Sequence, residues 1–223
     1  MKLRHRLGIS KHRQRQLTRL MEILLVGMFF IGLERRNGGI MVNTAVALLV
    51  VQLPPLLERD YNIPMDAGLT LWITSAVFLH ALGTVGIPGT GIESFYRYTG
   101  TWWWDHLTHA LSSSIVAAVG YATARAIDEH SDNITLPPKF MFVYILLFVL
   151  AFGVFWEVIE FTLDQTARML GVGGVLTQYG LEDTMLDLIF DTIGAVVVAI
   201  WGTAHLTGVV DAVRVRLDSR TAD

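Results

Sequence analysis

Acidic and histidine residues recur at helical spacing in three apolar parts of this sequence. They are Asp105, His106 and His109, then Glu157 and Glu160, and finally Asp183, Asp187 and Asp191. Side chains three or four positions apart lie on the same face of a helix. Ionisable side chains are costly inside a membrane and usually mark a functional site there. We therefore take these residues as the candidate site.

Carboxylates and imidazoles in this combination predict either a bound cation or a set of retained protons. Like charges at close range favour protonation, and a cation relieves the same repulsion. Oxygen and imidazole ligands suit Mg, Mn, Ca, Zn or Fe, and the absence of cysteine excludes thiolate ligands. The expected metal ligands are Asp105, His109, Glu157, Glu160, Asp187 and Asp191. The expected catalytic residues are His109, Glu157 and Asp187.

Simpler roles compete with function at several positions. Asp105 and Asp183 stand where their apolar stretches begin, and Asp is a preferred residue for capping a helix. His80 is grouped with His106 and Asp183 as a further member of the cluster, although a buried, hydrogen-bonded histidine would explain it equally well. The tryptophans at 102–104 are typical of the headgroup region and need no ligand.

Six apolar stretches are long enough to position these residues as membrane-spanning helices. About 20 mostly apolar residues cross the hydrocarbon core, where backbone groups must be hydrogen-bonded within a helix. The hydrophobic share of 52% and the charged share of 17% fit a surface that faces lipid. The sequence predicts an all-α, polytopic bundle with spans at 17–34, 39–57, 67–87, 107–127, 139–161 and 186–208.

Lysine and arginine are distributed unequally between the two sides of this bundle. Basic residues in short loops mark the cytoplasmic side, and they concentrate in the N-terminal tail, the C-terminal tail and the loops on that side. We expect a basic cytoplasmic tail (1–16), a six-helix membrane domain (17–210) and a cytoplasmic C-terminal tail (211–223). Both termini are then cytoplasmic, and the acidic and histidine residues lie at the outer face.

The ordered motifs resemble a known family of membrane proteins. The segments WDHLTH (104–109), FWEVIE (155–160), DTMLD (183–187) and DTIG (191–194) are similar to those of YjdF-type inner-membrane proteins of prokaryotes. The resemblance extends over residues 66–205. It implies a multi-pass protein of a prokaryotic plasma membrane, but no particular reaction.

A more distant resemblance is to VanZ-like membrane proteins, which show Asp-Lys-x-x-His, Glu-x-x-Gln and Asp-x-x-x-Asn-x-x-Gly in the same order. Asp105 and His109 keep the spacing of the first motif, with His106 in the place of the lysine. Glu160 replaces the glutamine of the second motif, and Asp191 the asparagine of the third. These substitutions make the present site more acidic than the VanZ-like pattern.

Three functions remain open at this point. The first is a metal-dependent enzyme that acts on lipid or lipid-linked headgroups at the outer leaflet. The second is a cation- or proton-coupled transporter, although no inverted sequence repeat is evident. The third is a non-catalytic membrane protein whose polar network specifies helix packing. The lipid bilayer is the expected partner, and the net charge of -3 argues against nucleic acid. The sequence does not predict the oligomeric state.

Overall fold

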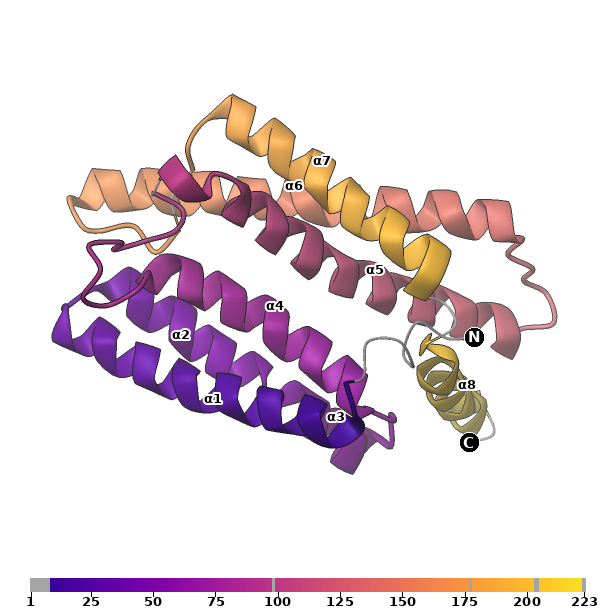
Figure 1. The fold of residues 1–223 in the computed structure, drawn as a ribbon. Helices are drawn as coiled ribbons and strands as arrows, with labels where there is room; N and C mark the ends of the chain where they lie inside the picture. The colour runs from indigo at the N-terminus through magenta and orange to yellow at the C-terminus, as the bar shows by residue number, and fades with distance from the viewer. Residues whose placement is uncertain (1–8, 98, 177, 203–204, 222–223) are drawn as a thin grey trace.

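The computed structural model describes residues 9–97, 99–176, 178–202 and 205–221 and is a bundle of long helices (Figure 1). In these ranges every regular element is helical, apart from one isolated bridge between Ile87 and Ile92. The elements are α1 (Lys11–Glu34), α2 (Gly38–Val50), α3 (Leu53–Tyr61), α4 (Ala67–Val85), η2 (Thr99–Thr101), α5 (Trp103–His130), α6 (Pro138–Leu170), α7 (Leu181–Val197), η3 (Val198–Gly202) and α8 (Thr207–Thr221). The all-α prediction is confirmed.

Five stretches of the described chain are helical, long and apolar enough to cross a membrane: α1, α2 with α3, α4, α5 and α6. The second of them is interrupted, because α2 ends at Val50 and α3 starts at Leu53. Pro54 and Pro55 follow in the first turn of α3, where a missing backbone N–H breaks no helical hydrogen bond.

The sixth predicted span differs most from the structure. Helix α7 has 17 residues and is not among the five long apolar stretches, but the π-helical turn η3 continues it to Gly202. It begins before the predicted boundary at 186, because Gly180 precedes it with φ 118°, a conformation that favours glycine. Asp183 therefore lies in the first turn of α7. The predicted end at 208 is also wrong, since α8 already begins at Thr207.

The fourth and fifth predicted spans are longer in the structure. Helix α5 begins four residues before the predicted 107. Helix α6 passes the predicted 161 and ends at Leu170, before Gly171, whose φ is 64°. Asp164 therefore lies on the same helix as Glu160, one turn further on. The predicted tails, 1–16 and 211–223, lie partly outside the described residues. The described part of the N-terminal tail contains the start of α1, and that of the C-terminal tail contains most of α8.

The helices form two units of three packed helices each, and corresponding helices in the two units run in opposite directions (Figure 1). Helices α1, α2 and α4 pack on one another, as do α5, α6 and α7, and α4 contacts α5 between the units. Leu25, Ile40 and Phe78 belong to the core of the first unit, and Ile145 and Ala195 to that of the second. Because α1, α2 and α4 alternate in direction along the chain and α5, α6 and α7 continue that alternation, the second unit is inverted relative to the first (Figure 1).

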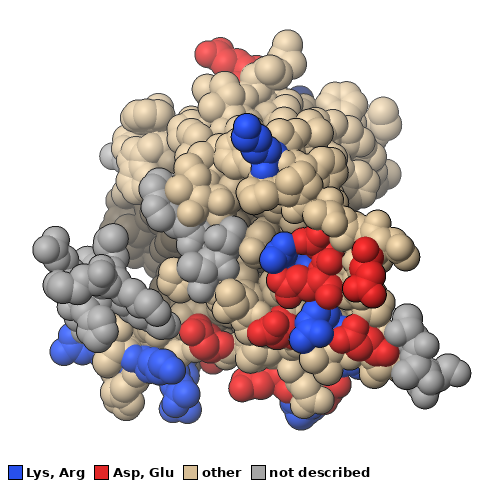
Figure 2. Space-filling model, turned by 90° about the vertical axis from the view of Figure 1, so that its right-hand side faces the viewer, with Lys and Arg blue, Asp and Glu red and all other residues tan. Residues whose placement is uncertain are grey.

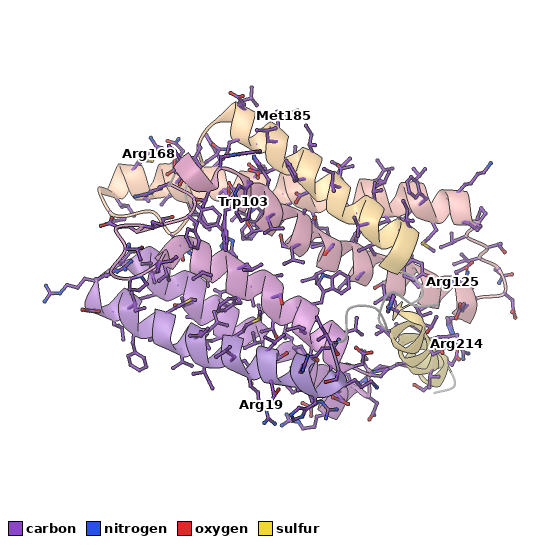
Figure 3. All side chains as sticks on the ribbon, in the orientation of Figure 1. Arg19, Trp103, Arg125, Arg168, Met185 and Arg214 are labelled. Carbon is purple, nitrogen blue, oxygen red and sulfur yellow. The ribbon has the colours of Figure 1, made fainter. Side chains whose placement is uncertain are left out.

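The bundle has two chemically different ends. The loops 35–37, 86–102 and 171–180 meet at one end, here called the loop end (Figure 1). Figure 2 looks onto the opposite end, where many Lys, Arg, Asp and Glu side chains gather. Figure 3 places Trp103 and Arg168 toward the loop end, and Arg125 and Arg214 toward the opposite end. Which end faces the cytoplasm stays a prediction from the distribution of basic residues.

Candidate functional site

Helices α5 and α7 pack closely enough to bring their polar faces together. A Cβ on Gly194 would lie 2.3 Å from both the carbonyl oxygen of Ala110 and the Oγ of Ser113. Ala117 and Ala195 are fully buried. Small residues allow helices to approach closely in a membrane bundle. The packing of α5 on α7 thus sets the distances between the polar side chains at the loop end.

His109 lies among carboxylates from both of these helices. Its Nε2 is 3.7 Å from Asp105 Oδ1 and 3.8 Å from Asp187 Oδ1. One ligand atom from each of these three residues lies within 4.8 Å of the others. Two ligands of one ion are separated by at most twice the bond length, about 4 to 5 Å for bonds of about 2.0 to 2.5 Å. The three side chains can therefore hold one cation between them.

Asp187 Oδ1 is buried and has no hydrogen-bond donor in the described part of the chain. It lies 3.7 Å from His106 Nδ1 and 3.8 Å from His109 Nε2, which is too far for a hydrogen bond. His106 Nδ1 is similarly buried and unsatisfied, while its ring stacks on Phe190 at 4.5 Å. Burying an unpaired carboxylate oxygen is unfavourable unless a ligand compensates. The geometry thus favours a cation or a proton beside Asp187.

Asp191 contacts the other nitrogen of the same imidazole. Its Oδ1 is 3.4 Å from His109 Nδ1. Gly153 on α6 makes room for this carboxylate, because a Cβ there would lie 2.6 Å from Asp191 Oδ2. A metal-ligating histidine usually gives its second N–H to a carboxylate or carbonyl. Asp191 is therefore placed to orient His109, although the sequence grouped it with the ligands.

The two glutamates of α6 have partners of their own. Glu157 Oε2 accepts a hydrogen bond of 2.7 Å from Thr184 Oγ1, which in turn accepts one from Gln178 Nε2. Glu160 Oε1 accepts a 3.0 Å bond from Trp156 Nε1. Among the described residues, neither glutamate belongs to the group of three ligand atoms around His109.

His80 and Asp183 have structural partners. His80 Nε2 is 3.1 Å from Asn43 Oδ1, and its Nδ1 is 3.0 Å from the Tyr96 hydroxyl. Because an amide oxygen only accepts, Nε2 carries the proton and Nδ1 accepts from the hydroxyl. Asp183 Oδ2 accepts a 3.3 Å bond from the backbone N–H of Tyr179 just before α7. The contacts of His80 match the hydrogen-bonded histidine considered above, whereas Asp183 lies in the first turn of α7 and is not its N-cap residue, which is Gly180.

A cavity of about 780 Å³ opens beside the histidine and its carboxylates. Both units and the loops contribute to its wall, with Asn43 and His80 from the first unit and Asp105, His109 and Glu160 from the second. Arg35, Arg97, Tyr96 and Tyr179 line it from the connecting segments. The loop 171–180 reaches across to the first unit, where Asn43 Nδ2 donates a 2.9 Å bond to the carbonyl of Val175.

The arginines and tyrosines of this wall are not among the site residues expected from the sequence. Loop residues carry no periodic signal that would place them near the helical acids. The arginines could have been singled out from the sequence, because the segments at the loop end contain few basic residues. These residues are Arg35, Arg36, Arg97 and Arg168.

The three tryptophans predicted to lie at the interface have different environments in the structure. Trp102 and Trp103 are exposed, at 71% and 43%. Trp104 instead turns inward, where its ring packs 4.4 Å from that of Phe95 and its Nε1 donates to the carbonyl of Leu79. A headgroup position therefore suits the first two, and Trp104 holds the loop 86–102 against α4.

Residues 17–208 match the sequence model of a family described as "Predicted membrane protein (DUF2238)". The chain belongs to this family. A protein of Thermotoga maritima, described as uncharacterized, is 32% identical over 146 residues, which are 66% of this chain and 67% of that protein. No solved structure matches the chain. The family confirms the expected YjdF-type resemblance and the membrane location, and the VanZ-like resemblance stays a prediction.

Proposed function

We propose that this protein is an enzyme of a prokaryotic plasma membrane that uses a divalent cation to act on lipid or lipid-linked headgroups. The observation that carries the proposal is the buried, unsatisfied Oδ1 of Asp187, which faces His109 close to Asp105. A cavity large enough for a polar headgroup adjoins these residues. The basic residues at the opposite end support an outer-face position for this site.

In this proposal Asp105, His109 and Asp187 are the metal ligands, and Asp191 orients the imidazole. Two carboxylates and one imidazole suit Mg, Mn, Ca, Zn or Fe. Such a cation would polarise a phosphoryl or carbonyl oxygen and make a bound water more acidic. The surrounding helices bury the ligands, which strengthens electrostatic interactions within the site.

The carboxylate best placed to move a proton is Glu160. It lines the cavity together with Asp105 and His109, and a general base must reach the proton that it abstracts. Glu157, expected from sequence to be catalytic, is instead hydrogen-bonded to Thr184 on α7. We assign Glu157 a supporting role, in which it joins α6 to the start of α7.

Metal binding is the first test, because every catalytic assignment depends on it. Purified protein is equilibrated with Mg, Mn, Ca, Zn or Fe, desalted and analysed by inductively coupled plasma mass spectrometry. We expect about one equivalent of one metal in the wild type, and its loss in Asp187→Asn and His109→Ala, because ligand removal weakens the site. Glu182→Gln is the matched control, an exposed acid on the same helix. A folded wild type that takes up none of the five metals would refute the proposal.

One observation favours the transporter as a second candidate. The cavity lies between two helical units, the second of which is inverted relative to the first. Many transporters place their substrate site at the interface of two such inverted units. The same acids would then form the coupling-ion site. Proteoliposomes that take up Mn²⁺, or that couple proton movement to it, with loss of flux in Asp187→Asn, would favour transport over catalysis.

A further inference from the structure

Two arginines line the same cavity as the acidic centre. Arg35 follows the C-terminus of α1, and Arg97 lies in the loop 86–102. They approach the cavity from connecting segments, whereas Asp105 and His109 come from α5. The cavity wall therefore carries two guanidinium groups as well as two of the candidate metal ligands.

Arg35 is held in place but keeps unused donors. Its Nη1 donates a 2.9 Å bond to the carbonyl of Val85, the last residue of α4. That carbonyl is one of those left without an intrahelical partner at a helix end. A guanidinium has five N–H donors, so this contact anchors the side chain and leaves most of its donors for another partner.

Neither cavity arginine pairs with a carboxylate among the described residues. Ion pairs within 4.0 Å are formed by other arginines of that part of the chain, which are Arg59, Arg125, Arg168 and Arg214. Arg35 and Arg97 thus differ from those four in having no counter-ion among the described residues, although both line a cavity that also contains Asp105 and Glu160.

The neighbour of Arg97 does not neutralise it. Arg97 lies against the Tyr179 hydroxyl in the loop 171–180. Burial raises the pKa of Tyr179, and the Arg97 guanidinium opposes that rise only in part. The phenol therefore stays protonated at neutral pH, so Tyr179 is not an anion that would compete with a ligand for Arg97.

We infer that Arg35 and Arg97 form an anion subsite that binds the phosphate group of the ligand. The planar guanidinium matches phosphate oxygens in paired hydrogen bonds. The cavity of about 780 Å³ falls in the usual range for small-molecule sites, about 300 to 1,000 Å³. The inference deepens the proposed function and rests on it, because it names a phosphorylated substrate for the same site. A phospholipid headgroup and a soluble phosphate ester share this chemistry.

The subsite is tested by titrating inorganic phosphate into protein in maltoside micelles, which contain no phosphate, with calorimetric detection. We expect both Arg35→Gln and Arg97→Gln to weaken binding about tenfold or more, because each removes a charge-assisted contact with phosphate. Arg36→Gln is the matched control, because Arg36 is next to Arg35 in the chain but its side chain is exposed and does not line the cavity. It should bind within about twofold of the wild type.

Arg35→Lys and melting temperatures separate a binding defect from misfolding. The lysine keeps the charge and should restore part of the affinity that glutamine loses. Wild type that binds no phosphate, or two glutamine variants that bind as tightly as the control, would overturn the anion subsite. Metal content is measured on the same samples, so retention of metal without phosphate binding rejects only this inference, and arginine-dependent phosphate binding without metal rejects only the metal-dependent function.

Competition identifies the source of the phosphate group. Short-chain phosphatidylglycerol and glycerol phosphate are each added to protein that holds inorganic phosphate. Displacement by the lipid alone supports a membrane headgroup as the ligand. Displacement by both at similar concentrations supports the subsite with a soluble phosphate ester as its ligand. Failure of both to displace phosphate would contradict the inference, because the bound ion would then not represent an organic phosphate.

Discussion

The two aspartates one turn apart on α7 differ in their surroundings. Asp187 leaves one oxygen without a hydrogen bond beside Nε2 of His109. Asp191 contacts Nδ1 of the same ring, in space that Gly153 leaves open. Identical residue types therefore receive different roles in our proposal, one as ligand and one as a positioning residue. The distinction follows from which ring nitrogen each carboxylate faces.

Asp191→Asn should weaken metal binding without removing the ligands. We expect the Mn²⁺ dissociation constant to rise about 10- to 100-fold, because loss of a carboxylate behind a metal-ligating histidine has effects of that size. Calorimetric titration of Mn²⁺ measures the change, and Glu182→Gln again serves as the control. Unchanged affinity in Asp191→Asn would show that the carboxylate does not orient His109.

At the scale of the elements, close packing of α5 on α7 determines whether the site exists. The contact at Gly194 admits no Cβ without movement of the backbone of α5 at Ala110. Gly27 on α1 has no atom within 4 Å of the same hypothetical Cβ. The two glycines are equivalent in the sequence pattern, since both interrupt apolar helices, but only one lies at a helix–helix contact.

Gly194→Ala should destabilise the protein, whereas Gly27→Ala should not. Overpacking at a tight contact costs about 1 to 3 kcal/mol. Alanine at an open helical position is favourable by up to about 1 kcal/mol relative to glycine. Thermal unfolding in detergent, followed by circular dichroism, compares the two variants. Equal melting temperatures would mean that α5 and α7 adjust to the extra methyl group at little cost.

At the scale of the whole molecule, the loops at the loop end join three pairs of helices. Helices α1 and α2, α4 and α5, and α6 and α7 are connected there, and α8 packs on α5 at the opposite end. Whether α7 with η3 crosses the membrane decides on which side α8 lies. That crossing would give the second unit three spans, as many as the first unit has, whereas the five long apolar stretches of the described chain leave it two.

Single-cysteine labelling tests this topology directly, because the chain contains no cysteine. We expect Thr90→Cys in the loop 86–102 to react with a membrane-impermeant maleimide on intact cells. Asp132→Cys and Ser219→Cys should react only after permeabilisation, because both then face the cytoplasm. Labelling of Ser219→Cys from outside would show that α7 does not cross.

The sequence by itself determined the long apolar helices and the ionisable residues that stand at their ends. Those features depend on local composition, since the membrane requires about 20 apolar residues per span and penalises each buried charge. The boundaries of α7 were less predictable, because Gly180 starts the helix through its backbone conformation and not through hydropathy.

Only the tertiary structure decided which polar residues meet. It groups Asp105, His109 and Asp187, and it gives Glu157 a separate partner on α7. It also brings Arg35 to the cavity from another unit. The physical reason is that distances between helices depend on packing at individual small residues and on the paths of loops, and helical periodicity describes only the face of one helix at a time.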